Sequence, residues 1–228
     1  MKRNILISIL KKFDPEFAHN IAILSLKYGL QPKRKITTDN ILKTKISGIN
    51  LKHPIGLSAG FDKNAEAIKG LVNIGFSFIE IGAVTPLPQK GNKKPRIHRI
   101  LEEEGIINSL GFNNKGMNKI YKNLLKKPDD CIIGVNLGSN KNTIDRSLDF
   151  IKVLKLFHND VDFATLNISS PNTDGLKELQ INDELEFLLS KVSKEKDNLS
   201  KKIPIFIKIS PDLNDKQLEN IVNQTIKF

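Results

Sequence analysis

The sequence predicts an α/β fold in which parallel strands alternate with helices, and three observations lead to that prediction. Five segments are apolar along their whole length, as expected for strands covered on both faces of a sheet. Each is followed by a stretch in which apolar residues recur at helical spacing. Polar side chains collect where the apolar segments end. A chain of 228 residues, 39% of them hydrophobic, is long enough to bury a substantial core.

The five strand–helix units follow one another from residue 54 onwards. The predicted strands are residues 54–60, 76–85, 131–138, 161–170 and 204–211. The helices predicted to follow them are residues 64–75, 114–127, 146–159, 184–202 and 215–228. A long loop joins the second strand to its helix. Before the first unit, residues 45–48 and 49–52 are predicted to form a short β-hairpin.

The polar residues near the strand ends favour a barrel over a doubly wound open sheet. They are Ser58, Lys63, Glu80, Asn136, Asn167, Ser170 and Lys208. A barrel builds its site from the carboxyl ends of many strands, whereas an open sheet concentrates its site at one switch point. Since a closed (β/α)8 TIM barrel needs eight units, the sequence predicts about five of them. We therefore expect the front part of a longer, C-terminally truncated protein, with open edges at the first and fifth strands.

Residues 1–36 differ from the rest of the chain in charge and pattern. The chain has a formal net charge of +11, and this segment holds eight basic residues against two acidic ones. Asp14-Pro15 is typical of an N-cap followed by the first turn of a helix. The apolar residues at helical spacing are Ile5, Leu6, Ile9, Leu10, Phe13, Phe17, Ile21, Leu24 and Tyr28. The segment is therefore predicted to form two amphipathic helices.

The amphipathic segment favours a membrane surface as its partner. Its longest apolar run, residues 5–10, is far too short to span a bilayer, and it lacks the length and cleavage site of a secretory signal. Basic amphipathic helices of this kind lie in the plane of a membrane interface. We favour that interpretation slightly over helices that simply pack on the domain.

Other classes of function receive little support from the composition. A single cysteine, Cys131, excludes an internal disulfide and fits a reducing compartment. The four histidines are scattered without metal-ligand spacing, so a metal site is not expected. No stretch alternates basic and aromatic residues as a nucleic-acid surface often does, so nucleic acid ranks well behind a membrane as the anionic partner.

Six short motifs lie at the ends of the predicted strands and in the loops beside them. They read AGFDK at residues 59–63, GAVTP at 82–86, NSLGFN at 108–113, GVN at 134–136, NISSPNT at 167–173 and KISPD at 208–212. Together and in this order they resemble the dihydroorotate dehydrogenase family, in its membrane-associated, quinone-dependent class. The resemblance runs from the first helices to the last residue.

The resemblance implies an FMN-dependent barrel enzyme of pyrimidine (UMP) biosynthesis that oxidises dihydroorotate to orotate. A base removes a proton from carbon 5, carbon 6 gives a hydride to FMN, and the electrons pass to a membrane quinone. It also implies a peripheral protein on the cytoplasmic face of the inner membrane. The expected domains are residues 1–36, a membrane and quinone-access segment, and residues 45–228, the FMN-binding barrel. The oligomeric state and the particular quinone stay open.

The resemblance assigns the catalytic base to Ser170. The membrane-associated class has serine at this position, whereas the cytosolic class has cysteine. A serine hydroxyl is a poor base at neutral pH unless a relay takes its proton onward. Thr173 and Phe112 match residues that flank this serine in the family, and Thr173 is expected to hold a relay water.

The expected substrate is a flat anion with carbonyl and amide groups. Lys63 is expected to pair with its carboxylate. Asn108, Asn167 and Asn172 offer amide groups that both donate and accept hydrogen bonds, which matches the edge of an imide ring. The loop that follows Asn108 is also expected to contact the substrate. Its residues are Ser109, Leu110, Gly111 and Phe112.

The flavin is expected to contact residues from several strand ends. Gly60 lets the backbone approach the ring closely, and Lys208 matches a flavin-contacting lysine that stabilises the anionic reduced flavin. A lysine inside an apolar strand is costly to bury unless it meets negative charge. The full set of expected FMN contacts is Ala59, Gly60, Phe61, Asp62, Lys63, Ala83, Asn136, Asn167 and Lys208.

The sequence departs from the family pattern at two positions. Ala83 stands where the family usually has Ser or Thr, so one side-chain hydrogen bond to FMN is lost. Ser109 stands where Arg is common, which puts that part of the substrate loop in doubt. The loops after the seventh and eighth barrel strands, which normally bind the flavin phosphate, are also expected to lie outside the chain.

Three alternatives stay open beside this interpretation. The chain could be a non-catalytic barrel fragment with a basic membrane-binding arm. It could be another FMN barrel oxidoreductase that acts on a related pyrimidine, although Lys63 and the three asparagines favour orotate. It could be a basic nucleic-acid binder, which flavin absorbance of the purified protein would argue against.

Overall fold

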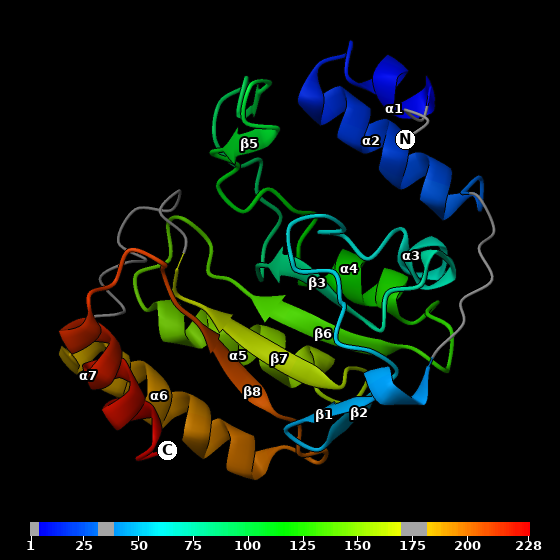
Figure 1. The fold of residues 1–228 in the computed structure, drawn as a ribbon. Helices are drawn as coiled ribbons and strands as arrows, with labels where there is room; N and C mark the ends of the chain where they lie inside the picture. Colours follow the sequence, from blue (N-terminus) through cyan, green and yellow to red (C-terminus); the bar gives the residue numbers. More distant parts are fainter. Residues whose placement is uncertain (1–4, 32–38, 170–181) are drawn as a thin grey trace.

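A parallel four-stranded sheet forms the centre of the molecule (Figure 1). The computed structural model describes residues 5–31, 39–169 and 182–228. The strands lie in the order β3-β6-β7-β8 and all neighbours are parallel. Their bounds are β3 Phe78–Val84, β6 Ile132–Leu137, β7 Phe163–Asn167 and β8 Ile205–Lys208. Sequential order in space is the arrangement of a β/α barrel wall, as the sequence predicts.

The first predicted strand, residues 54–60, is reduced to a single parallel bridge between Leu57 and Ile79. Leu57 N–H donates to the carbonyl of Phe78, and Glu80 N–H donates to the carbonyl of Leu57. Gly60 N–H then donates to the carbonyl of Gly82. The segment therefore follows the edge of β3 as the first unit should, but Pro54 and the turn at residues 59–62 keep it from pairing along its full length.

The predicted helices are present, and each of them ends before its predicted last residue. They are α3 Ile68–Ile74, α4 Met117–Leu124, α5 Arg146–Phe157, α6 Asn182–Asn198 and α7 Asp215–Thr225. Helix α3 ends at Gly75, which takes the left-handed conformation with φ of 111°. Helix α7 begins with a capping box between Asn214 and Gln217. The capping residues thus determine where these helices begin and end. Apolar periodicity alone predicts ends that lie a few residues too far along the chain.

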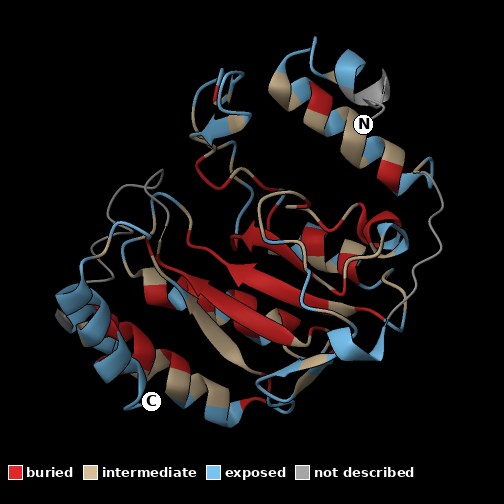
Figure 2. Ribbon diagram, in the orientation of Figure 1, coloured by how far each residue is buried: buried red, intermediate tan, exposed pale blue. Residues whose placement is uncertain are grey.

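The core lies between the sheet and the helices that cover its outer face. Figure 2 shows β3, β6 and β7 buried, whereas β8 is only half-buried. Helix α5 turns Phe150, Val153, Leu154 and Phe157 toward the sheet, and all four are fully buried. Burial of such side chains contributes roughly 1.5–3 kcal/mol each.

The opposite, inner face of the sheet is filled by aromatic rings near the start of the strands. The rings of Phe78, Phe163 and Phe206 pack edge to face across the strands, at centroid distances of 6.1 and 5.6 Å. A Cβ at Gly134 would stand 2.1 Å from the Phe163 ring, so only glycine leaves room there. The predicted hairpin, β1 Thr44–Ile46 and β2 Ile49–Leu51, lines an apolar cavity with these rings. The amino ends of the strands are therefore closed by apolar packing.

A second hairpin occupies the loop predicted between residues 85 and 114. Strand β4 (Ile97–Ile100) pairs antiparallel with β5 (Gly105–Asn108). The segment reads IHRILEEEGIIN, which lacks the clean alternation of a half-buried hairpin, because both faces of its tip are exposed. Its strand character comes from packing against the N-terminal helices.

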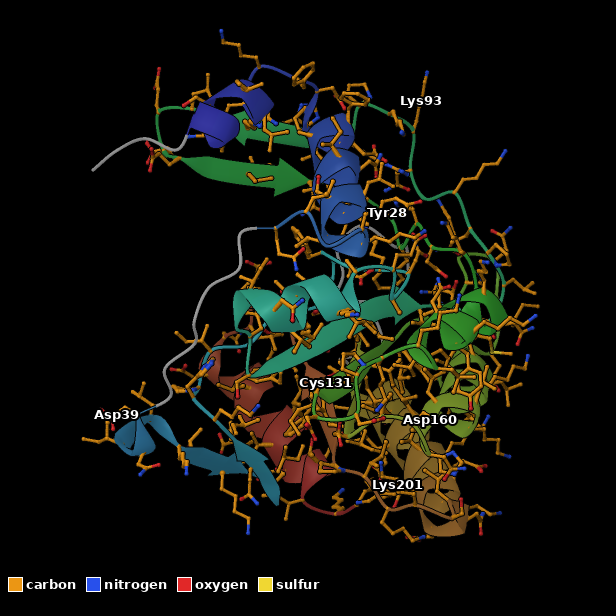
Figure 3. All side chains as sticks on the ribbon, turned by 90° about the vertical axis from the view of Figure 1, so that its right-hand side faces the viewer. Tyr28, Asp39, Lys93, Cys131, Asp160 and Lys201 are labelled. Atoms are coloured by element: carbon orange, nitrogen blue, oxygen red, sulfur yellow. The ribbon has the colours of Figure 1, made fainter. Side chains whose placement is uncertain are left out.

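The N-terminal segment forms the predicted pair of helices, α1 (Ile5–Leu10) and α2 (Pro15–Lys27). The Asp14 side chain accepts a hydrogen bond from Phe17 N–H at 2.9 Å and so caps α2. Figure 3 shows the β4–β5 hairpin beside α1 and α2, with Tyr28 at the end of α2. Within the described residues, no helix combines the length and apolar character needed to cross a bilayer.

Candidate functional site

A cavity of about 570 Å³ opens at the carboxyl ends of the strands. Its walls come from the segment after Leu57, from β3, from the loop after β5, and from the ends of β7 and β8. The lining residues are Ala59, Gly60, Lys63, Ala83, Asn108, Leu110, Gly111, Phe112, Asn167, Ser169, Lys208, Ile209, Ser210, Pro211 and Asp212. Ten of these are residues that the sequence predicts for the site. The structure thus brings together predicted residues from as far apart in the chain as Ala59 and Lys208.

Four predicted site residues do not line this cavity. Phe61 and Asp62 line a smaller cavity of about 110 Å³ beside α2, which they share with Lys63. Asn136 is fully buried one layer beneath the cavity wall. Ser109 is half-buried, and its N–H donates to the carbonyl of Arg96 at 2.9 Å. The predicted residues Ser170, Asn172 and Thr173 lie outside the described residues.

A chain of hydrogen bonds crosses the sheet directly beneath the cavity. Glu80 accepts Ala59 N–H at 3.1 Å and the side-chain amide of Asn136 at 2.9 Å. The Asn136 oxygen accepts the side-chain amide of Asn167 at 2.9 Å. The Asn167 oxygen in turn accepts the N–H and the hydroxyl of Ser169, at 3.3 and 3.0 Å. Glu80, Asn136, Asn167 and Ser169 therefore form one connected network, as buried polar groups require.

The stagger of the strands explains why these side chains meet. Glu80 stands level with Gly134 of β6, and Asn136 stands level with Gly82 of β3. Asn167 lies two residues beyond Thr165, the residue of β7 that is level with Asn136, and it stands level with Lys208. Gly82 also lets the two backbones lie close together, because a Cβ there would lie 2.7 Å from the backbone carbonyl oxygen of Asn136.

Lys63 lies where the two cavities meet. Its ammonium group donates to the side-chain oxygen of Asn113 at 2.6 Å. Burial and, to a smaller extent, the nearby Arg96 charge lower the pKa of Lys63 to about 8, whereas the Glu16 charge opposes the shift. A lysine in this setting, hydrogen-bonded to a neutral amide, is a cation that favours an anionic ligand.

The loop at residues 108–113 is held in a strained conformation over the cavity. Gly111 and Phe112 both have positive φ, 66° and 53°. Gln89 donates to the carbonyl of Gly111 at 3.1 Å, and Asn92 donates to the carbonyl of Ser109 at 2.9 Å. The surrounding contacts thus fix a backbone that Phe112 would rarely adopt by itself.

The end of β8 supplies the opposite wall. Lys208 is the last residue of β8 and is exposed, whereas the three strand residues before it are half-buried. Asp212 N–H donates to the Ser210 hydroxyl at 3.3 Å, which folds the following turn toward the cavity. Residues 209–212 therefore belong to the cavity wall, although the sequence assigns them no role.

An ion pair connects helix α2 to the loop that leads into the site. The guanidinium of Arg96 donates two hydrogen bonds to Glu16, at 2.6 and 3.1 Å, and two more to the carbonyls of Lys90 and Asn92. The hydrogen bond from Arg96 holds the pKa of Glu16 below its usual value. Pattern analysis misses this pair, because nothing local in the sequence links residues 80 positions apart.

Further along the hairpin, Arg99 closes the turn between the two N-terminal helices. Its guanidinium donates to the carbonyls of Leu10, Lys11 and Phe13. These carbonyls follow the end of α1, where backbone acceptors lack helical partners. The β4–β5 hairpin is thereby joined to both α1 and α2.

The residue that sequence reasoning most clearly misses is Glu80. The sequence places it among the polar residues of the strand ends but gives it no role in the site, and its side chain organises the layer under the cavity. The available signal is a charged residue inside the apolar run FSFIEIGAV. No cluster of three or more His, Cys, Asp or Glu in the described part of the chain is arranged to hold a metal ion.

Sheet order, alternating helices and a polar rim at the carboxyl ends of the strands place the chain in the class of β/α-barrel proteins. The family model for dihydroorotate dehydrogenase matches residues 41–227. The chain therefore belongs to the dihydroorotate dehydrogenase family.

Curated relatives support the same family. A protein of Bartonella henselae named dihydroorotate dehydrogenase (quinone) is 44% identical over 221 residues, which are 95% of this chain and 61% of that protein. A protein of Rhizobium etli with the same name is 44% identical over 218 residues, 94% of this chain and 60% of that protein. The chain thus spans about three fifths of the length of these relatives.

Solved structures show the same fold. A dihydroorotate dehydrogenase of Eimeria tenella in complex with ferulenol matches with a TM-score of 0.90 and 32% identity, over 98% of this chain and 67% of that one. The ligand-free form from the same organism matches with a TM-score of 0.88 and 34% identity, over 94% of this chain and 66% of that one. The five β/α units are accordingly those of this barrel fold.

Proposed function

We propose that the chain carries the substrate side and part of the flavin side of a quinone-dependent dihydroorotate dehydrogenase. The whole protein would oxidise dihydroorotate to orotate in pyrimidine biosynthesis. The observation that carries the proposal is the cavity itself, which is lined by Lys63, Asn108, Asn167 and Lys208 together. Family membership and the names of the relatives support the same activity.

The cavity fits the ring system of FMN. Gly60 has φ of 110°, and a Cβ built on it meets nothing within 4 Å, so the backbone there borders open space that a planar ring can enter. Ala59 and Ala83 add small side chains to the same wall. Asn167 and Lys208 supply polar groups of the kind that contact ring nitrogens and carbonyls. When bound, FMN would accept the hydride that the substrate releases.

The substrate would lie over that ring, held by groups of matching chemistry. Lys63 is the cation available to its carboxylate, Asn108 is an amide available to its ring carbonyls and N–H groups, and Asn167 would donate to a ring carbonyl. Phe112 and Leu110 add apolar cover that reduces contact with water. The orientation of the loop depends on its contacts with Gln89 and Asn92.

Ser170 is proposed as the base that takes the carbon 5 proton, on the strength of the family resemblance. Asn172 and Thr173 are proposed as a substrate contact and a relay position on the same ground. The described part of the chain leads to this position through Ser169, whose hydroxyl and N–H contact Asn167.

Residues 1–36 are proposed to form the membrane and quinone-access segment. The apolar N-terminal surface, defined as Ile9, Phe13, Phe17, Leu24 and Tyr28, is exposed on α1, α2 and the residues that flank them. Helix α2 lines the smaller cavity that Lys63 shares with the main site, so a route to the flavin would pass beside this helix. The protein would be peripheral, on the cytoplasmic face of the inner membrane.

The activity is tested by the visible spectrum of the purified protein with FMN, before and after dihydroorotate is added without oxygen. A bound-flavin spectrum that bleaches with dihydroorotate supports the proposal. Flavin that binds but is not reduced by dihydroorotate would instead indicate another substrate. Absence of flavin binding would contradict the cofactor assignment for this chain.

The membrane role is tested by co-sedimentation with vesicles of anionic lipid. The double variant Phe13→Ser/Phe17→Ser is expected to lose most of the bound fraction. The control is Phe187→Ser on α6, because Phe187 is 50% exposed and Phe17 is 51% exposed. Equal binding by both variants would contradict a specific role for the N-terminal helices.

A further inference from the structure

The side-chain hydrogen bonds beneath the cavity run in one direction, from Ser169 through Asn167 and Asn136, and Glu80 stands at their end. Both oxygens of Glu80 accept: one from Ala59 N–H and one from the Asn136 amide. Because carboxylate oxygens only accept, the Asn136 amide must turn its nitrogen toward Glu80 and its oxygen away.

That orientation passes on to the next side chain. The Asn136 oxygen faces Asn167, so Asn167 must present its nitrogen, and the distance between them is 2.9 Å. The Asn167 oxygen is then left for the N–H and hydroxyl of Ser169. Glu80, Asn136 and Asn167 are all buried, with exposed fractions of 9%, 0% and 6%, so bulk water does not readily replace these partners.

We propose that Glu80 is a positioning residue that sets the amide orientation of Asn167 through Asn136. In this orientation Asn167 donates one N–H to Asn136 and no acceptor for its second N–H is found among the described residues, so that N–H is left for a molecule in the cavity, while Ser169 occupies its oxygen. The site would therefore select a ligand edge that carries a carbonyl acceptor, as flavin and pyrimidine rings do. The ligand part of this inference rests on the proposed function, whereas the orientation part rests on the hydrogen bonds alone.

The test is the variant Glu80→Gln, which keeps the shape of the side chain but allows acceptance at only one terminal atom. When the introduced glutamine donates toward Asn136, the Asn136 amide reverses, and two N–H groups then face each other between Asn136 and Asn167. Hydrogen exchange measured by NMR on the ligand-free protein follows each link separately. Protection of the Asn167 side-chain amide and of Ser169 N–H is expected to fall in this variant.

A second variant provides a rescue that a purely structural role would not show. In Glu80→Gln/Asn136→Asp, the introduced glutamine accepts from Ala59 and donates to the new carboxylate, which accepts from Asn167. Protection at Asn167 and Ser169 is expected to return. The control is Asp162→Asn, because Asp162 accepts Ile133 N–H at 2.8 Å near the opposite end of the same strands.

Loss of protection confined to Ala59 and Asn136, or failure of the double variant to restore Asn167, would overturn the inference. Titration with FMN provides the second arm: Glu80→Gln is expected to weaken FMN binding about tenfold, as loss of a hydrogen bond to a buried polar group does. If the unaltered protein binds no FMN, the proposed function fails, while the exchange measurements still decide whether Glu80 orients Asn167.

Discussion

The side-chain amide of Asn167 donates a hydrogen bond to the side-chain oxygen of Asn136 over 2.9 Å, across 31 positions of sequence. Asn136→Leu would remove the acceptor of Asn167 and the donor of Glu80 together. We expect the free energy of unfolding to fall by about 1–3 kcal/mol, since buried polar groups lose their partners. Urea unfolding measures this. Asn198→Leu, at an exposed position of α6, should change it little, and equal losses would contradict the special role of the buried layer.

The lowered pKa of Lys63 leads us to expect that ligand binding depends on pH. Its pKa of about 8 means that the ammonium group loses its proton above that pH in the ligand-free protein. Orotate affinity of the FMN-loaded protein is therefore expected to be level below pH 8 and to fall by about tenfold per pH unit above it, because one proton must be bound with the anion. Isothermal titration measures this. Lys63→Met should bind weakly with no such slope.

The same shift has a consequence for stability. The pKa of Lys63 is below its ordinary value of 10.5, so the unfolded chain binds more protons than the folded chain between about pH 8 and 10.5. Stability contributed by this group therefore rises with pH across that window. Urea unfolding should show the unaltered protein gaining stability relative to the Lys63→Met variant as the pH rises there. A constant difference between the two proteins would contradict the lowered pKa.

The ion pair between Glu16 and Arg96 is expected to stabilise the attachment of α2 to the loop that leads into the site. Arg96→Lys keeps the charge but loses the paired hydrogen bonds, and we expect a loss of about 1–3 kcal/mol at neutral pH. The pKa of Glu16 is lowered in the folded protein, so this stabilisation is present above its ordinary value of 4.5 and is lost as the pH falls through the lower folded value. Urea unfolding at neutral and acid pH checks both points. Lys94→Ala, which removes an exposed partner of Glu16, should cost little.

Gly70 predicts a steric limit between α2 and α3. A Cβ at this position would lie 2.4 Å from the carbonyl oxygen of Leu26, a backbone atom that can move only if the helices separate. Gly70→Ala is expected to destabilise the protein by about 1–3 kcal/mol and to loosen α2 first. Hydrogen exchange of the α2 amides measures the second effect. Gly105→Ala is the control, because its nearest neighbours lie 3.9 Å away.

Replacement of Ser170 is expected to slow the reaction without weakening the binding of orotate. Ser170→Ala is expected to slow flavin reduction by dihydroorotate roughly 10²–10⁴-fold, the usual contribution of a general base. Orotate affinity should stay within about threefold, because the anion and ring contacts are made elsewhere. Stopped-flow reduction and orotate titration separate the two. Ser170→Cys should recover part of the rate, and full activity of the alanine variant would exclude Ser170 as the base.

Much of the fold follows from local pattern. The runs around Ile81, Val135 and Leu166 are apolar on both faces, which indicates parallel strands with both faces covered, and helices follow each of them. The hairpin β4–β5 is not predicted, because its exposed tip carries no alternating pattern. Its contacts are made with α2 and, through Arg99, with the Phe13 carbonyl, and these partners are distant in sequence.

Some residues of the candidate site are likewise predicted from the sequence, and others are found only in the structure. Lys63, Asn108, Asn167 and Lys208 are predicted from the sequence and do line one cavity. The sequence does not assign Glu80, Gln89 and Arg96 to the site, since each acts on another residue and none belongs to a motif with its partner. Lys208 is exposed at the end of β8, although the residues of the strand before it are apolar and half-buried.

The sequence by itself determined the strand–helix alternation, the polar strand ends and the family motifs, because these depend on residues close together in the chain. Only the tertiary structure decided which polar residues meet. The stagger between β3, β6 and β7 brings Glu80, Asn136 and Asn167 into one line of hydrogen bonds. A shift of one residue in any strand would turn its side chains to the other face and break that line, and such a register is set by packing across the whole sheet.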